Sequence, residues 1–169
     1  IDSPQAGPCE PAGISVVVES IAENVSETSQ RAYVEKMVSF GTRSTISDAT
    51  SNTRGIGAAR RWVETEFRGM ASACGGCLQI VTPSDTVTGA RYPQPTLVVD
   101  VVAIQRGATD PNRVIIIQGH LDSRNSTNEN VTDDAPGAND DASGVAAVME
   151  SARILSKRKF PATIVYAAL

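Results

Sequence analysis

Apolar residues recur at helical spacing in three parts of the chain. One pattern covers residues 33–38 and stops before Gly41, a second runs through residues 59–70, and a third covers residues 143–156. A period near 3.6 residues places such positions on one face, so each segment predicts a helix that packs against a core. Trp62 lies on the second stripe, and we interpret it as a core residue rather than a binding platform.

Shorter apolar and β-branched runs predict strands at residues 77–82, 96–105, 113–119 and 163–169. The connection at residues 107–112 is rich in turn residues and short enough to join the second and third strands as a hairpin. The fourth strand follows the third helix. If it lay at the edge of the sheet it would promote aggregation unless another chain covered it.

The strand at 113–119, the helix at 143–156 and the strand at 163–169 form one βαβ unit, whose two strands should lie parallel. Residues 114–117 are all apolar, which is typical of a central strand covered on both faces. The predicted fold class is therefore α/β: a mixed sheet with an antiparallel hairpin joined to a parallel βαβ portion, and helices on both faces.

The length and composition fit one domain with an N-terminal arm. The chain has 169 residues with 41% hydrophobic content, enough for one substantial core. Residues 1–13 carry three prolines and two glycines without an apolar period, so they predict an extended arm, and residues 14–169 form the domain. Fifteen basic residues against 19 acidic ones argue against nucleic acid as a partner. The apolar runs are too short for a membrane span.

The three cysteines point to a local disulfide. Cys74 and Cys77 are separated by two glycines and run into a strand-like segment, which favours a disulfide over a redox centre that opens a helix. Cys9 then has no partner within the chain. The chain starts at Ile1 without a leader, so we expect a processed protein that is secreted or periplasmic.

Candidate metal chemistry follows the apolar strand. His120, the only histidine, comes directly after the strand end, where ligand sites of α/β sheets gather. Asp122 lies two residues on, so its carboxylate can reach the same side and orient the imidazole.

Asp140 and Asp141 precede the third helix. One of them could simply cap that helix, but Ser143 is already available as a cap, so a metal role is the sharper interpretation. Zinc accepts both imidazole nitrogen and carboxylate oxygen. From the residues alone, capping and metal binding both stay open.

Two motifs resemble the co-catalytic zinc aminopeptidase family, the bacterial leucine aminopeptidase-like metallopeptidases. They are Gly-His-Leu-Asp-Ser at residues 119–123 and Ala-Pro-Gly-Ala-Asn-Asp-Asp-Ala-Ser-Gly at residues 135–144. The resemblance implies two zinc ions, with His120 binding one and Asp140 bridging both. It further implies that Asp122 takes part in catalysis by orienting His120. Asp141 would follow Asp140 through a cis peptide bond, with Asn139 in support.

The resemblance also implies the substrate and what is missing. The expected substrate is a peptide with a free N-terminus, from which the enzyme removes the first residue. Family members continue after the last strand into a segment with the general base and another ligand, and no such segment is present. We therefore expect an incomplete N-terminal portion that is inactive alone, with the C-terminal remainder as its partner. The alternatives are a glutaminyl-cyclase-like acyltransferase with a single zinc and a non-catalytic binding domain of the same fold.

Overall fold

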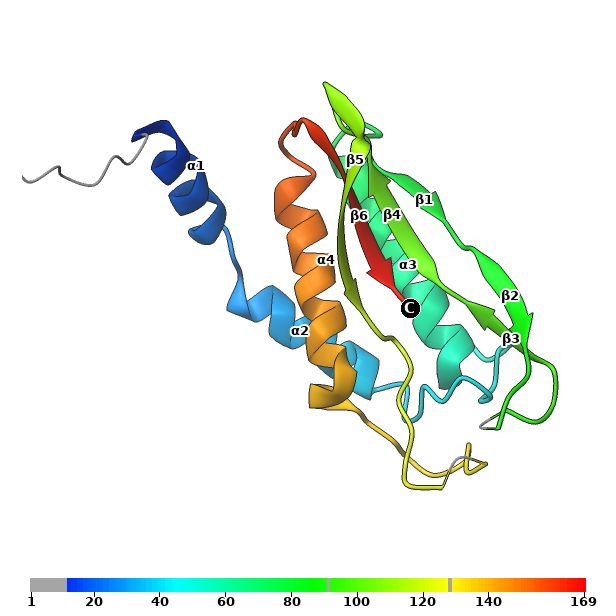
Figure 1. Cartoon of the computed structure of the whole chain (residues 1–169). Helices are drawn as coiled ribbons and strands as arrows, with labels where there is room; N and C mark the ends of the chain where they lie inside the picture. The colour runs from blue at the N-terminus through cyan, green and yellow to red at the C-terminus, as the bar shows by residue number, and fades with distance from the viewer. Residues whose placement is uncertain (1–11, 91, 128) are drawn as a thin grey trace, which may run out of the picture.

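The computed structural model describes residues 12–90, 92–127 and 129–169 (Figure 1). Its elements in chain order are α1 (Ala12–Ala22), α2 (Glu27–Val38), α3 (Gly55–Ala73), β1 (Gln79–Val81), β2 (Ser84–Val87), β3 (Thr96–Val99), β4 (Val101–Gln105), β5 (Asp110–Gly119), a short π-helical turn η1 (Ala138–Ala142), α4 (Ser143–Leu155) and β6 (Ala162–Ala168). None of the helices in these ranges is long and apolar enough to cross a membrane.

The main sheet has the strand order β1-β4-β6-β5 (Figure 1). β6 runs antiparallel to β4 and parallel to β5. The mixed α/β fold class and the parallel βαβ unit are therefore confirmed. The predicted hairpin between β4 and β5 is wrong, because β6 returns from α4 and inserts between them. A short connection in the sequence does not decide which strands pair when a later strand takes the position between them.

The prediction that residues 114–117 lie in the centre of the sheet is also wrong for the described chain. β5 lies at the edge with β6 as its neighbour, and the side chain of Ile116 is 60% exposed. The strand at 163–169, which the sequence left as a potential edge, is the buried one. An apolar run predicts that a strand will be covered, but the covering element must be present to bury it.

The predicted strand at residues 96–105 is divided in two. β3 ends at Val99 and pairs with β2 in a separate two-stranded sheet, whereas β4 begins at Val101 and joins the main sheet. β2 was not predicted. All four of its residues are exposed, so it lacks the apolar alternation that identifies a strand in a sequence.

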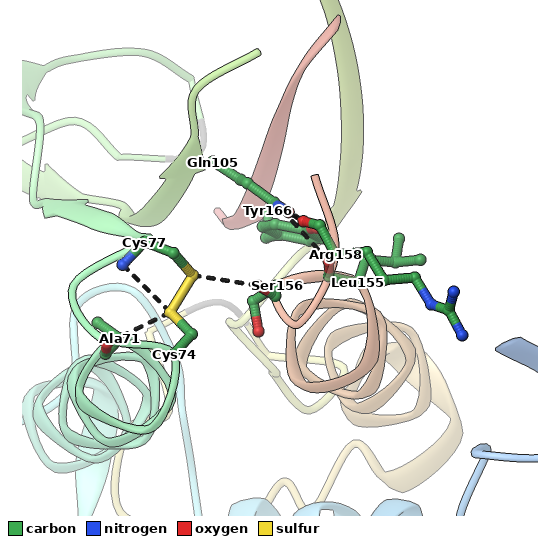
Figure 2. Close-up of a disulfide and its surroundings, with 8 residues drawn as sticks. All are labelled: Ala71, Cys74, Cys77, Gln105, Leu155, Ser156, Arg158 and Tyr166. Atoms are coloured by element: carbon green, nitrogen blue, oxygen red, sulfur yellow. Dashed lines mark hydrogen bonds between the residues drawn. A yellow bond between two sulfur atoms is a disulfide. The ribbon is translucent and has the colours of Figure 1, made fainter. Parts of the chain in front are cut away.

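Helices α3 and α4 pack on the same face of the main sheet. Ala103 and Tyr166 are paired neighbours on this face and are completely buried in one cluster with Val63 of α3 and Met149 of α4. Figure 2 shows both helices side by side beneath the strands. Helices on both faces were expected, but within the described ranges the opposite face, which includes Ile116, has no helix over it.

The N-terminal helices differ in how well the sequence predicted them. Helix α2 begins after Ser26, whose hydroxyl oxygen accepts the N–H of Ser29 at 3.1 Å, a standard N-cap. Helix α1 begins at Ala12, so residues 12 and 13 of the predicted arm are helical; the rest of that prediction, residues 1–11, lies outside the described structure. The sequence did not predict this helix, because residues 16–18 are three exposed valines and β-branched residues have low helix propensity.

Two other predictions are confirmed in the core and at its border. Trp62 packs against the hydrophobic cluster, with its ring centroid 6.2 Å from that of Tyr33. Cys74 and Cys77 form a disulfide between the end of α3 and the start of β1 (Figure 2). The Sγ atom of Cys77 lies 3.2 Å from the carbonyl oxygen of Ser156, at the end of α4. Cys9 lies outside the described residues.

Candidate metal centre

The candidate site lies at the carboxyl end of β5, beside the end of β6. Gly119 pairs with Ala168, and the ladder continues past both strands: Leu121 N–H donates to the Leu169 carbonyl at 2.6 Å. The N–H of Leu169 donates in return to the carbonyl of Gly119 at 3.0 Å. These bonds fix the backbone on both sides of His120, so its imidazole projects from the end of the sheet where ligands of α/β folds bind.

The imidazole of His120 is oriented by Asp122. Its Nδ1 lies 3.1 Å from the Asp122 carbonyl oxygen and 3.1 Å from Oδ1 of the same residue. Both partners are acceptors, so Nδ1 carries a proton and acts as the donor. The lone pair of the neutral ring is then on Nε2, which faces away from Asp122. The sequence spacing predicted this arrangement of the two side chains.

Asp140 faces the other nitrogen of the imidazole. Its Oδ1 lies 2.9 Å from Nε2 of His120, and its side chain is 89% exposed. A carboxylate and the lone pair of a neutral imidazole repel each other at this distance unless a proton or a metal cation lies between them. One nitrogen and one carboxylate oxygen are ligand types that zinc prefers. The pair therefore fits the donor chemistry of a zinc ion.

Asp141 has different partners from its neighbour. Its Oδ2 accepts the backbone N–H of His120 at 3.1 Å, and its Oδ1 accepts the N–H of Gly144 at 3.0 Å. The carboxylate thus caps the start of α4 and ties it to the end of β5. The peptide bond between Asp140 and Asp141 is cis, as the family resemblance implied. Of the two roles that the sequence left open, capping belongs to Asp141, and the exposed carboxylate of Asp140 remains as the candidate metal ligand.

Ser143 and Asn139 are placed differently from the expectation. The hydroxyl of Ser143 donates to the carbonyl oxygen of Asn139 at 2.9 Å, and the N–H of Gly144 is capped by Asp141. Asn139 is exposed, and its backbone carbonyl is the acceptor of this bond. The supporting role of Asn139 stays a prediction.

Three carboxylates change the protonation of His120. Partial burial alone would lower the pKa of the imidazole. The hydrogen bond to Asp122, the charge of Asp122, the hydrogen bond to Asp140 and the charge of Asp141 outweigh burial and raise the pKa above its ordinary value of 6.5. In the metal-free chain the proton therefore stays on the ring to a higher pH than usual, and a metal ion has to displace it.

The cavity beside His120 has two donors of a kind that suits a metal ion. A cavity of about 310 Å³ is lined by His120, Asp122, Ser123, Arg124 and Asp140. Within residues 12–90, 92–127 and 129–169, no group of three or more His, Cys, Asp or Glu side chains is placed to hold a metal ion. Zinc in proteins takes about four ligands, and catalytic sites keep about three from the protein. His120 and Asp140 would therefore be two donors of a larger set.

The loop between α2 and α3 contributes residues that the sequence analysis did not single out. Arg43 is completely buried and donates hydrogen bonds to the backbone near both His120 and Asp140. Thr45 donates to Oδ2 of Asp122 at 3.4 Å. Both residues stand in a run of small polar residues without hydrophobic periodicity, so the only available signal was one arginine in such a run.

Comparisons with known proteins find zinc peptidases among the proteins that resemble this chain. Residues 100–169 match the model of Peptidase family M28. A probable zinc metalloprotease of Pyricularia oryzae is 49% identical over 140 residues, which cover 82% of this chain and 28% of that protein. A second one, from Leptosphaeria maculans, is 44% identical over 153 residues, covering 90% of this chain and 36% of that protein. The chain thus spans about a third of the length of these relatives.

Solved structures share the fold at low sequence identity. A Zn-dependent exopeptidase from Parabacteroides distasonis is similar with a TM-score of 0.60 and 17% identity, covering 84% of this chain and 46% of that one. A glutaminyl cyclase from Porphyromonas gingivalis is similar with a TM-score of 0.62 and 22% identity, covering 85% and 45%. At these identities the comparison shows the fold alone.

Proposed function

We propose that this chain, whose residues 100–169 match the model of Peptidase family M28, is part of a zinc-dependent exopeptidase of the aminopeptidase type. The observation that carries the proposal is the approach of His120 Nε2 to Asp140 Oδ1 at 2.9 Å, with Asp122 on the other ring nitrogen. The names of the fungal relatives support zinc and peptide hydrolysis.

Each residue of the site has a separate part in this proposal. His120 would hold one zinc ion through Nε2, and Asp140 would bridge two. Asp122 keeps the proton on Nδ1 and thereby holds Nε2 ready as a ligand. Asp141 fixes the distance between the end of β5 and the start of α4. The bound metal supplies Lewis acidity and lowers the pKa of a water molecule.

The substrate class follows from the type of enzyme proposed. It is a peptide with a free N-terminus, whose amino group is held near the metal so that the first residue is removed. The general base and the remaining ligands would come from the C-terminal part of a longer protein, in line with the length of the relatives. We propose that the 169-residue chain by itself has no peptidase activity.

A second candidate is acyl transfer by a single-zinc, glutaminyl-cyclase-like enzyme. The glutaminyl cyclase from P. gingivalis, with a TM-score of 0.62, supports a shared fold. Both candidates use a histidine and an aspartate, so the number of zinc ions separates them. A non-catalytic binding domain ranks below both, because His120 and Asp140 already face each other at a distance that suits a shared cation.

The test compares zinc content and product chemistry. Zinc per chain is measured by mass spectrometry for the purified chain, for the longer protein and for its His120→Ala and Asp140→Ala variants. An N-terminal glutaminyl peptide is then supplied as substrate. Two zinc ions per longer protein, release of the first residue, and loss of both in the variants are the expected results. One zinc ion with pyroglutamyl product would favour the cyclase, and turnover by the 169-residue chain alone would contradict its proposed inactivity.

We further propose that the protein is secreted or periplasmic. The Cys74–Cys77 disulfide supports this, because such bonds persist in oxidising compartments and are rare in the cytosol. Detection of the native protein with free thiols at both positions would count against export.

A further inference from the structure

Arg43 lies at the centre of the loops that carry the proposed ligands. Arg43 is 0% exposed, although it lies in the irregular loop that follows α2. Four hydrogen bonds hold the guanidinium, all to backbone carbonyls. Nε donates to Leu121 at 2.8 Å, Nη1 to Met37 at 3.0 Å and to Pro136 at 2.7 Å, and Nη2 to Gly137 at 3.1 Å.

Three of these acceptors belong to the two segments that bear His120 and Asp140. Leu121 stands directly between His120 and Asp122, while Pro136 and Gly137 precede the turn that carries Asp140. The planar fork of one guanidinium thus bonds both segments at once. Its fourth acceptor, Met37, ties the fork to the end of α2, an element packed in the core.

A second connection runs through the backbone of Arg43. Its N–H donates to Oγ of Ser123 at 3.1 Å, and its carbonyl accepts the N–H of Ser123 at 3.3 Å. The hydroxyl of Ser123 donates onward to the carbonyl of Ala135 at 2.6 Å. The loop after His120 and the loop before Asp140 are therefore joined twice, once through each end of Arg43.

The guanidinium is a buried cation, and its four hydrogen bonds go to neutral backbone carbonyls. Burial lowers the pKa of Arg43 to about 10, and the charges of Asp122 and Asp141 oppose the shift. The group stays protonated at neutral pH. Placing such a charge in the interior is costly unless its N–H groups are bonded. The four carbonyls meet this requirement, and in turn they would lose their donor if an apolar side chain replaced Arg43.

We propose that Arg43 is a positioning residue that holds the His120 and Asp140 segments at the separation a shared metal ion requires. This inference rests on the proposed function, since it assigns Arg43 to the same metal site. Arg43 acts on the ligands through the backbone and does not contact the metal or the substrate. Lysine cannot replace it, because a single ammonium group does not span carbonyls on both segments.

The test measures zinc binding by the chain itself. His120 is the only histidine, so its imidazole gives a single, unambiguous NMR signal to follow during zinc titration. The variants are Arg43→Lys and Arg43→Ala. The matched control is Arg61→Lys, because Arg61 also donates only to carbonyls, those of Ala49, Thr50 and Ser51, away from the site. Thermal unfolding and amide hydrogen exchange of residues 120–123 and 137–142 are recorded for each.

We expect Arg43→Lys to stay folded, to exchange its amides faster in both segments, and to bind zinc about tenfold more weakly, as outer-shell changes typically do. Arg61→Lys should leave zinc affinity unchanged. Arg43→Ala lacks the guanidinium group altogether. Low concentrations of free guanidinium should therefore restore zinc binding in this variant, and should not restore it in His120→Ala.

The outcomes separate the two proposals. A folded Arg43→Lys variant with wild-type zinc affinity overturns the positioning role and leaves the proposed function standing. Absence of zinc from the longer protein counts against the metal site itself, and with it against Arg43 as its positioning residue. Failure of guanidinium to restore binding in Arg43→Ala also contradicts the inference.

Discussion

At the scale of single residues, neighbouring carboxylates have distinct physical environments. Asp140 projects into solvent with 89% of its side chain exposed, whereas Asp141 accepts two backbone N–H groups from different elements. A carboxylate that caps a helix and closes a connection between elements contributes to stability. An exposed carboxylate opposite an imidazole contributes little to it in the absence of a metal.

This contrast predicts that alanine substitution of the two residues affects the stability of the fold to different extents. We expect Asp141→Ala to lower the free energy of unfolding by about 2 kcal/mol, because two backbone donors lose a charged acceptor. Asp140→Ala should change it by less than about 0.5 kcal/mol, as exposed positions usually do. Urea unfolding of the metal-free chain at neutral pH measures both. Equal losses in the two variants would show that the assignment of Asp141 as the cap is wrong.

At the scale of elements, α4 anchors the N-terminal helices through one buried acid. Glu150 is 3% exposed, accepts the N–H of Ser26 at 2.6 Å and pairs with Arg153 at 2.6 Å. Arg153 also donates to the carbonyl of Asn24 at 2.7 Å, in the link between α1 and α2. Helical periodicity predicted α4 and α2 separately. It did not show that Glu150 of α4 faces the start of α2, which only the fold reveals.

Glu150 predicts a pH dependence of stability. Burial alone would raise its pKa, but the hydrogen bonds from Arg153 and from the Ser26 N–H, with the charges of Arg153 and Lys157, lower it below 4.5. A lowered pKa in the folded state gives stability that is present above pH 4.5 and is lost as the pH falls through the folded pKa. Glu150→Gln should therefore cost about 1 to 3 kcal/mol at pH 7 and progressively less in acid.

Thermal unfolding of wild type and Glu150→Gln between pH 7 and pH 3 measures this difference. Glu23→Gln serves as the control, because Glu23 is exposed in the same N-terminal region. A gap between wild type and Glu150→Gln that stays constant over the whole pH range would contradict the prediction.

At the scale of the whole molecule, one sheet edge and one sheet face are open within the described chain. Val114, Ile115 and Ile116 of β5 are 51%, 51% and 60% exposed, and β5 pairs on one side only. Exposed apolar edge strands promote association between chains. In the longer protein that we propose, further elements would cover this region.

We expect the isolated chain to self-associate through β5. Ile116→Lys should shift the chain toward monomer, because a charge on an edge strand disfavours pairing with a second strand. Leu97→Lys is the control, since Leu97 is 57% exposed in the separate β2–β3 sheet. Light scattering after size-exclusion chromatography, over a range of concentrations, reports the effect. Equal association of wild type and Ile116→Lys would place the contact elsewhere.

The sequence by itself determined the local features of this protein. Apolar periodicity predicted α2, α3 and α4, the His120–Asp122 spacing predicted an oriented imidazole, and the glycine-linked cysteines predicted their disulfide. Each depends on residues a few positions apart, where helix and strand geometry set the distance.

Only the tertiary structure decided the features that depend on distant residues. The insertion of β6 between β4 and β5, the packing of α3 and α4 on one face, and the burial of Arg43 between two loops all join segments far apart in the chain. Local patterns carry no information on which later strand pairs with an earlier one. They also do not show where a single arginine in a polar loop meets the carbonyls that hold it.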